Sequence, residues 1–320
     1  MLRFLLRRAA AALVLLWLVA TVTFALVSLA PGDASARLAD PRIAPEVRQR
    51  FRRDFGLDRP WPARYVEWLG AAARGDLGVS WVHHREVTAV LAGAVPATAL
   101  LAGLGLLLEI AGGLALALVQ LRRPHGRVDR AITGLSLAAY ALPAFVVALF
   151  LQYLFAYRWR LLPPSHLLSP AGELATGLPR LADQLRHLVL PVAAIALTGM
   201  GAVARYLRGS LLDERGQLYV LAARARGCSE RRALWAHALP NALLPLVTMV
   251  GLSLPFLISG SLVIEVIFAW PGMGQTMYSA ALARDLPLLM GGTLLATLAV
   301  VAGNAVADLT YALVDPRVRV

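Results

Sequence analysis

Long apolar runs separated by short charged stretches dominate this chain of 320 residues. An apolar run of about 20 residues is long enough to cross the hydrocarbon core of a bilayer as a helix. The pattern predicts an all-α integral membrane protein with about six transmembrane helices. We place these spans at residues 9–29, 96–121, 132–157, 188–206, 241–268 and 286–313.

Proline residues interrupt several of the predicted spans. Pro143 lies in the third span, Pro191 in the fourth, and Pro245 and Pro255 in the fifth. Proline is tolerated in membrane helices because neighbouring groups satisfy the freed backbone atoms. We expect a kink at Pro143. Both Pro143 and Pro255 are candidates for places where a translocation pathway bends, although simple packing kinks are the alternative.

Composition supports the membrane class and excludes several others. The chain is 58% hydrophobic, whereas soluble domains are nearer 45–50% apolar. Its net charge of +12 comes entirely from arginine, because the sequence contains no lysine. Arginine next to spans sets topology, so the charge does not indicate nucleic-acid binding. A single cysteine, Cys228, excludes an internal disulfide and a structural zinc site built on several thiolates.

The distribution of arginine predicts the orientation. A cytoplasmic N-terminus places residues 3–8, 122–130, 211–240 and 317–319, all bearing arginine, on the cytoplasmic side, as the positive-inside rule requires. The C-terminus is then cytoplasmic as well. The first apolar run is longer than the 7–15 residues of a signal-peptide core, so we expect an uncleaved anchor.

Three regions follow from this topology. Residues 1–30 form the cytoplasmic N-terminus and first span, residues 31–95 an extracytoplasmic helical segment, and residues 96–320 a core of five spans. The extracytoplasmic segment is rich in aromatic residues, and Phe51 and Phe55 begin an apolar face at helical spacing. These aromatics serve either as anchors in the membrane interface or as a small cap that meets a partner.

The polar stretch at residues 211–240, called the hairpin below, lies between two long apolar segments. Gly227 suits the position after a helix, where a left-handed residue is needed. Ser229 can cap the next helix, with Glu230 in its first turn. Pro240 is expected to end that second helix. We expect so compact a basic hairpin to be presented to a soluble partner.

Part of the hairpin carries a specific family resemblance. Residues 219–227, YVLAARARG, followed by HALP at 237–240, resemble the cytoplasmic "EAA" signature of binding-protein-dependent ABC importer permeases. The matching positions are Ala222, Ala223, Gly227, Leu239 and Pro240. Leu221 replaces the usual Glu and His237 the usual Ile, which is similar to the dipeptide, oligopeptide and nickel permeases.

Further landmarks of that subfamily occur along nearly the whole chain. They are PGD at 31–33, FGLDRP at 55–60, GDLG at 75–78, EVIFAWPGMG at 265–274, RDLP at 284–287 and DPR at 315–317. A single landmark would be weak evidence, but together they are specific. Within this set we expect Glu265 and Trp270 to anchor the outer end of the fifth span in the interface.

The resemblance implies that the hairpin docks in a groove on a cytoplasmic ATPase subunit. The residues expected at that contact are Tyr219, Ala222, Ala223, Arg224, Ala225, Arg226, Gly227, Ser229, Glu230, Arg231, Arg232, Trp235, His237 and Pro240.

Within that contact the residue types differ in their expected roles. The three alanines would permit close approach of the partner backbone, and the four arginines would pair with acidic groups. Leu234 and Trp235 are candidate apolar anchors. We expect Leu221 and Leu239 to pack within this chain instead.

Polar residues inside the spans are the candidates for a translocation pathway. Glu109 lies midway through the second span, where an ionisable group is costly and therefore a functional hypothesis. It could attract a substrate amine, or it could pair with an arginine or a neighbouring helix. Asn304 and Asp308 are one turn apart in the sixth span and face one side, as pathway residues or as interhelical hydrogen-bond partners.

The resemblance implies the permease subunit of an ATP-driven importer in a bacterial inner (plasma) membrane. Its cargo would be short peptides or a related small solute, with nickel or a metal chelate as the alternative. The neighbouring His83 and His84 are only weak evidence for metal, and we predict no metal site. A proton-coupled secondary transporter is a less favoured class, because it would leave the hairpin without a role.

The expected partners are a second homologous permease subunit, two cytoplasmic ABC ATPase subunits, an extracytoplasmic solute-binding protein and the lipid bilayer. Without lysine the chain cannot form a P-loop. We therefore expect no enzymatic activity and no cofactor in this chain, with ATP and magnesium bound by the ATPase subunits.

Overall fold

A computed structural model describes residues 2–29, 46, 49, 58–243, 246 and 262–314. These parts are helical and contain no strand, apart from one isolated bridge between Val79 and Glu86. The prediction of an all-α protein is confirmed for them.

The helices follow one another along the chain with few long connections. They are α1 (Leu2–Leu29), α3 (Trp61–Ala72), α4 (Val87–Leu121), α5 (Arg127–Ala141), α6 (Ala144–Leu151), α7 (Pro170–Leu174), α8 (Leu178–Arg215), α9 (Leu218–Ala225), α10 (Glu230–Ala233), α13 (Leu262–Ile267), α14 (Met273–Ala283) and α15 (Leu286–Val314), with π-helical turns η2 (Gln152–Arg158) and η3 (Leu234–Ala238).

Four of the described helices are long and apolar enough to cross a membrane, namely α1, α4, α8 and α15. Helices α5 and α6 with η2 count as a fifth span if the bent pair crosses as one unit. The predicted span at residues 241–268 lies mostly outside the described residues. Helix α4 begins at Val87, earlier than the predicted residue 96, because Pro96 is accommodated inside the helix.

The predicted kink at Pro143 is confirmed in position, but it is a break and not a gentle bend. The two helices on either side meet at 102°. Leu142 has an extended backbone (φ −81°, ψ 131°), and Pro143 caps the start of α6. Proline disfavours the helical conformation of the residue before it, which explains why the third span divides here.

Helices α4 and α8 form the central pair of the fold, and glycine allows them to pack closely. A Cβ atom at Gly105 would lie 2.7 Å from the Cγ2 atom of Ile195. One at Gly113 would lie 2.5 Å from Cγ1 of Val203. Small residues bring membrane helices together in this way, because their backbones can approach where no side chain intervenes.

The turn between α13 and α14 is anchored to α4 by buried polar groups. Thr98 donates a hydrogen bond of 2.8 Å to Glu265, whose carboxylate also accepts from the Gln275 backbone N–H at 3.1 Å. The indole of Trp270 donates to the Ala97 carbonyl oxygen at 2.8 Å. Both Glu265 and Trp270 are fully buried. Their prediction as interface anchors is wrong, because α4 covers them.

The aromatic residues of the segment before α4 pack mainly against the protein. The rings of Tyr65 and Phe24 lie 5.3 Å apart at their centroids, and Trp68 and Trp81 join the same apolar cluster between α1 and α15. Trp61, by contrast, is 49% exposed. Phe51 and Phe55 lie outside the described residues, so the choice between interface anchors and a cap stays open for them.

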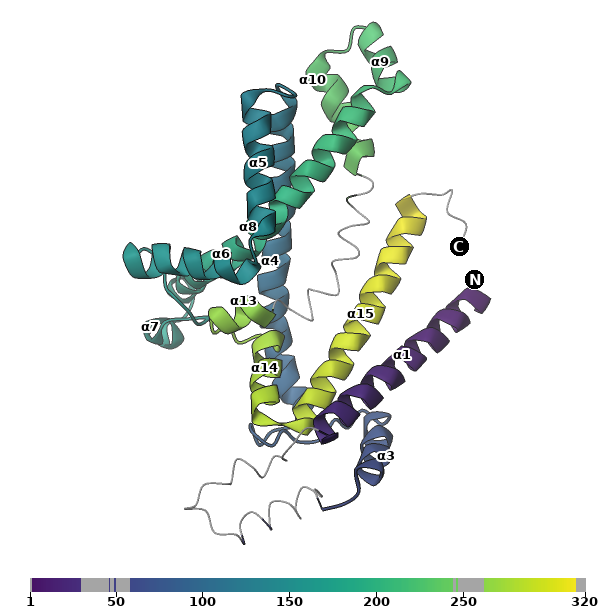
Figure 1. Ribbon diagram of the computed structural model, residues 1–320, viewed down its shortest axis with the longest axis vertical. Coiled ribbons are helices and arrows are strands. Elements are labelled where there is room, and N and C mark those ends of the chain that lie inside the picture. Colours follow the sequence, from purple (N-terminus) through teal and green to yellow (C-terminus); the bar gives the residue numbers. More distant parts are fainter. Residues whose placement is uncertain are drawn as a thin grey trace.

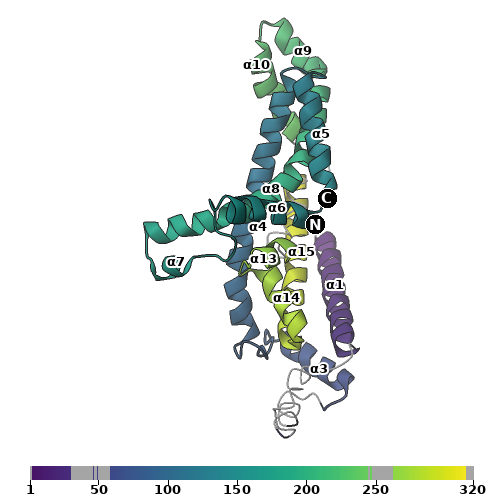
Figure 2. The same ribbon diagram turned by 60° about the vertical axis from the view of Figure 1, so that its left-hand side comes forward.

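The two ends of the molecule carry different structures. Helices α9 and α10 stand at one end, whereas α3 and the turn from α14 to α15 lie at the other (Figure 1). The view turned by 60° shows the same separation (Figure 2). Helix α8 reaches the first of these ends, where it carries the hairpin.

Candidate functional site: the arginine-rich hairpin

The hairpin is two helical arms at the far end of α8. Residues 211–215, the first five of the predicted hairpin, belong to the end of α8. The first arm is α9, and the second arm is α10 followed by η3. Val220, Ala233 and Ala238 form a small buried core between the arms, with Cys228 and Leu234 packed against it. The hairpin therefore has an apolar core of its own.

The tip of the hairpin is the turn that the sequence predicted. Gly227 has φ +92°, and its N–H bonds the Arg224 carbonyl at 2.9 Å, while the Cys228 N–H bonds the Ala223 carbonyl at 3.1 Å. This pair of bonds is a Schellman motif, which requires a left-handed residue. The Ser229 hydroxyl then accepts from the Arg232 N–H at 3.4 Å and caps the second arm.

The second arm does not end at Pro240, so that prediction is wrong. The helix continues through Pro240 to Leu243 after the π-helical turn η3. There the Leu239 N–H bonds the Leu234 carbonyl, five residues back. A proline ring inside an α-helix clashes with the carbonyl four residues earlier, and the wider π turn relieves this conflict.

The exposed surface of the hairpin is basic and open. Arg224, Arg226, Arg231 and Arg232 are exposed, and Trp235 is 48% exposed. An open groove of about 480 Å³ is lined by Ser229, Arg231, Arg232 and Trp235. Positive charge beside an accessible indole can bind an acidic protein surface that also offers an apolar contact.

The structure corrects some of the predicted roles in the hairpin. Ala222 and Ala225 are exposed, but Ala223 is buried against the second arm and cannot meet a partner. Leu239 is buried as predicted. Leu221 is 44% exposed, so its prediction as a packing residue is wrong.

A polar cluster joins the first arm to the second arm and to the end of α8. The Tyr219 hydroxyl donates to the Glu214 carboxylate and accepts from Asn241 Nδ2 at 2.9 Å. The same Asn241 amide donates to the carbonyl of the half-buried His237 at 2.9 Å. Partial burial, with a further contribution from Glu214, raises the pKa of the Tyr219 phenol. Tyr219 is thus a neutral donor that fixes the arms.

Arg215, the last residue of α8, connects the hairpin to α4. Its guanidinium pairs with Glu230 at the start of the second arm. It also donates to the Leu121 carbonyl oxygen at the end of α4, at 3.5 Å. This contact was not predicted from the sequence, because Arg215 lies outside the matched signature.

The candidate pathway residues are not gathered in one place. Glu109 is half-buried and faces α8, and Pro143 lies at the break between α5 and α6. Asn304 is exposed on α15. Asp308 lies in the same helix, but its side chain is outside the described residues, as is Pro255. His83 and His84 occupy an exposed turn, and the described residues contain no cluster of three potential metal ligands.

Two family matches together cover nearly the whole chain. Residues 109–320 match the family described as the binding-protein-dependent transport system inner membrane component, and residues 1–102 match the N-terminal family of the same membrane components. The chain is 33% identical to the oligopeptide transport system permease protein AppB of Bacillus subtilis, over 98% of each protein.

Other relatives also match this chain over its full length. A putative peptide permease protein of Brucella suis is 35% identical over the full length of both chains. The dipeptide transport system permease protein DppB of Escherichia coli is 30% identical, over 100% of this chain and 99% of its own. The chain therefore belongs to the family of inner-membrane components of binding-protein-dependent transport systems.

Proposed function

We propose that this permease takes up short peptides, delivered by an extracytoplasmic binding protein and driven by ATP hydrolysis in separate subunits. The observation that carries the proposal is the hairpin, an exposed basic surface with its own core at the end of a membrane-spanning helix. Peptides are the cargo because the relatives are named as oligopeptide, dipeptide or peptide permeases. No relative among them favours the nickel alternative.

The hairpin docks on a cytoplasmic ATPase subunit. Its exposed arginines steer and orient an acidic partner surface, and Trp235 supplies an apolar anchor. The buried core and the Tyr219 cluster hold the two arms together as a rigid body. A displacement of the hairpin tip by the ATPase subunit is therefore transmitted to α8. ATP and magnesium bind the ATPase subunits, and this chain binds neither.

The assembly contains two permease subunits, two ATPase subunits and one binding protein. The hairpin end faces the cytoplasm, and the end with α3 faces the binding protein. Two features support this orientation. The first residues of α1 and the last residues of α15 lie towards the hairpin end of their helices (Figure 1), and arginine is frequent in the loops of that end.

Glu109 contributes to the translocation pathway by interacting with the N-terminal ammonium group of a peptide. It is a carboxylate within the membrane-spanning helix α4, and no residue of the described chain forms a hydrogen bond or ion pair with it. An intramembrane carboxylate is costly and is retained where it meets a positive charge or water.

Uptake by proteoliposomes tests this function. The complex is reconstituted with its ATPase subunits and binding protein, and ATP-dependent uptake of a labelled tripeptide and of nickel is compared. We expect uptake of the tripeptide that requires both ATP and the binding protein. Uptake of nickel without uptake of the tripeptide would overturn the peptide assignment. Peptide uptake that requires a proton gradient and does not require ATP would overturn the ATP-driven mechanism.

A further inference from the structure

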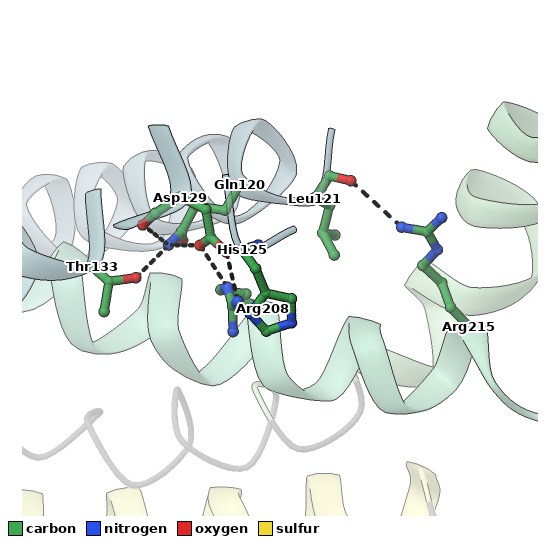
Figure 3. Close-up of polar contacts among 7 residues, drawn as sticks. All are labelled: Gln120, Leu121, His125, Asp129, Thr133, Arg208 and Arg215. Carbon is green, nitrogen blue, oxygen red and sulfur yellow. Dashed lines mark hydrogen bonds and ion pairs between the residues drawn. The ribbon is translucent and has the colours of Figure 1, made fainter. Parts of the chain in front are cut away.

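A buried ion pair joins α5 to α8 below the hairpin (Figure 3). Arg208 Nε donates to Asp129 Oδ1 at 2.7 Å, and Arg208 Nη2 donates to Asp129 Oδ2 at 2.6 Å. Asp129 is only 2% exposed. Two parallel bonds between a guanidinium and a carboxylate fix distance and orientation together, so the pair resists both separation and rotation of the two helices.

The Asp129 carboxylate also binds residues of α4 and of the loop between α4 and α5. It accepts from the His125 backbone N–H at 2.7 Å and from Gln120 Nε2 at 2.9 Å. Gln120, in the last turn of α4, also donates to the Thr133 hydroxyl at 3.0 Å and is itself buried. The end of α4, the loop and the start of α5 are therefore one bonded unit, which Arg208 attaches to α8.

Arg208 and Arg215 lie on the same face of α8. They are seven residues apart, which is close to two helical turns. Arg208 holds Asp129, while Arg215 holds the Leu121 carbonyl and Glu230 of the hairpin. One face of α8 thus links the hairpin, the end of α4 and the start of α5.

We propose that Asp129 and Arg208 are positioning residues that make α5 follow the hairpin, so that motion imposed on the hairpin reaches the bent α5–α6 pair. This inference rests on the proposed function, because it assumes that a partner moves the hairpin. Helix α6 packs on α8 through Ala148 and Leu151 in the main apolar cluster. Helix α5 also contacts α8 where Ser136 packs against Gly201 and where the Arg205 guanidinium lies 5.1 Å from the centroid of the Tyr140 ring. The ion pair adds two directional bonds near the hairpin, and these bonds fix the start of α5 relative to α8.

The test uses the complete complex in lipid nanodiscs and measures ATP hydrolysis with and without peptide-loaded binding protein. The variants are Asp129→Asn, Arg208→Gln and the double variant Asp129→Asn/Arg208→Gln, which leaves no buried charge unpaired. The control is Arg130→Gln, which removes an exposed arginine of α5 directly next to Asp129.

We expect each single variant to keep its basal hydrolysis and to lose at least about fivefold of its stimulation by loaded binding protein, the lower range of typical coupling between sites. The double variant should be no worse than the single variants, because all three remove the same contact. Wild-type stimulation in an assembled double variant would overturn the proposal. If a single variant fails to assemble, the stimulation of the double variant is used in its place, because the double variant lacks the ion pair but has no unpaired buried charge.

A distance measurement separates positioning from general stability. Cys228 packs against the hairpin core and is replaced by serine, whereas Leu218 of α9 and Leu135 of α5 are 83% and 72% exposed. Spin labels on Leu218→Cys and Leu135→Cys should keep one distance between the ATP-free and ATP-bound complex. The distance should change with nucleotide when Asp129→Asn is added. A distance that changes in the parent complex, or stays fixed with Asp129→Asn, would overturn the proposal.

Failure of the proposed function gives a different result. If the wild-type complex transports no peptide and shows no stimulation by loaded binding protein, then the proposed function is wrong. If the wild-type complex is stimulated and the assembled variants are stimulated equally, only the role of Asp129 and Arg208 is wrong.

Discussion

The carboxylate of Glu109 on α4 lies directly against the backbone of Gly199 on α8. A Cβ atom at Gly199 would be 2.1 Å from the carboxyl carbon of Glu109, so no other residue fits there unless Glu109 moves. The position of this intramembrane carboxylate is thus set by a glycine on another helix. Charge and position can therefore be changed separately.

Removal of the Glu109 charge should slow transport. Glu109→Gln keeps the size of the side chain but loses a charged acceptor, and such hydrogen bonds contribute about 1.5–3 kcal/mol, so we expect a fall of about tenfold or more. Gly199→Ala should lower the rate by displacing the carboxylate. The measurement is the peptide uptake rate at saturating loaded binding protein. Glu109→Asp keeps the charge but withdraws the carboxylate, so its rate should fall as that of Gly199→Ala does. A wild-type rate in Glu109→Gln would show that Glu109 contacts no substrate.

Replacement of Glu265 by alanine should destabilise the protein without altering its selectivity. The change leaves the Thr98 hydroxyl and the Gln275 N–H without their acceptor in a buried site, at about 1–3 kcal/mol for each group. Thermal unfolding of the purified protein should shift to lower temperature. The exposed Glu67→Ala is the matched control, and equal shifts for the two variants would disprove the structural role of Glu265.

Asp285 should hold the segment before α4 in place. Its two carboxylate oxygens accept from the Ser80 hydroxyl at 2.6 Å, the Val82 N–H at 3.0 Å and the Leu288 N–H at 3.2 Å. In Asp285→Asn one of the two accepting oxygens is replaced by an NH₂ group, which cannot accept a hydrogen bond. At least one of the three contacts is therefore lost. We expect faster cleavage by trypsin after the exposed Arg85, followed by mass spectrometry. Cleavage at the wild-type rate would mean that the contacts of Asp285 do not hold the segment.

The contribution of Tyr219 to stability should depend on pH only in the alkaline range. Its pKa is raised in the folded protein, chiefly by burial, so folding favours the neutral phenol. The stabilisation is therefore fully present below the ordinary tyrosine pKa of about 10 and is lost as pH rises through the higher folded value. The difference in melting temperature between wild type and Tyr219→Phe should be constant from pH 6 to 9. A difference that falls within that interval would contradict the assignment.

Local features of the hairpin could be predicted because they depend on a few adjacent residues. Gly227 and Ser229 act through backbone conformation and a capping hydroxyl, and both were found as predicted. The break at Pro143 follows from the same kind of local rule. Its 102° angle could not be predicted, since the angle depends on how α6 packs against α8.

Features that depend on contacts between distant residues could not be predicted. Glu265 and Trp270 look like interface residues in sequence, but α4 buries them. Pro240 failed to end its helix because a π turn accommodates it. The ion pair between Asp129 and Arg208 joins residues far apart along the chain, and its only signal was an acidic residue within an arginine-rich loop.

Substitution of Gly227 tests the coupling role of the hairpin most directly. A Cβ atom there would meet nothing within 4 Å, so only the left-handed backbone limits the residue. Asparagine tolerates this conformation, whereas the β-branched valine does not. The measurement is ATP hydrolysis by the reconstituted complex, with and without peptide-loaded binding protein. We predict that Gly227→Asn keeps this stimulation and that Gly227→Val, inserted and assembled, loses it. Full stimulation in Gly227→Val would contradict the assignment of the hairpin as the coupling element.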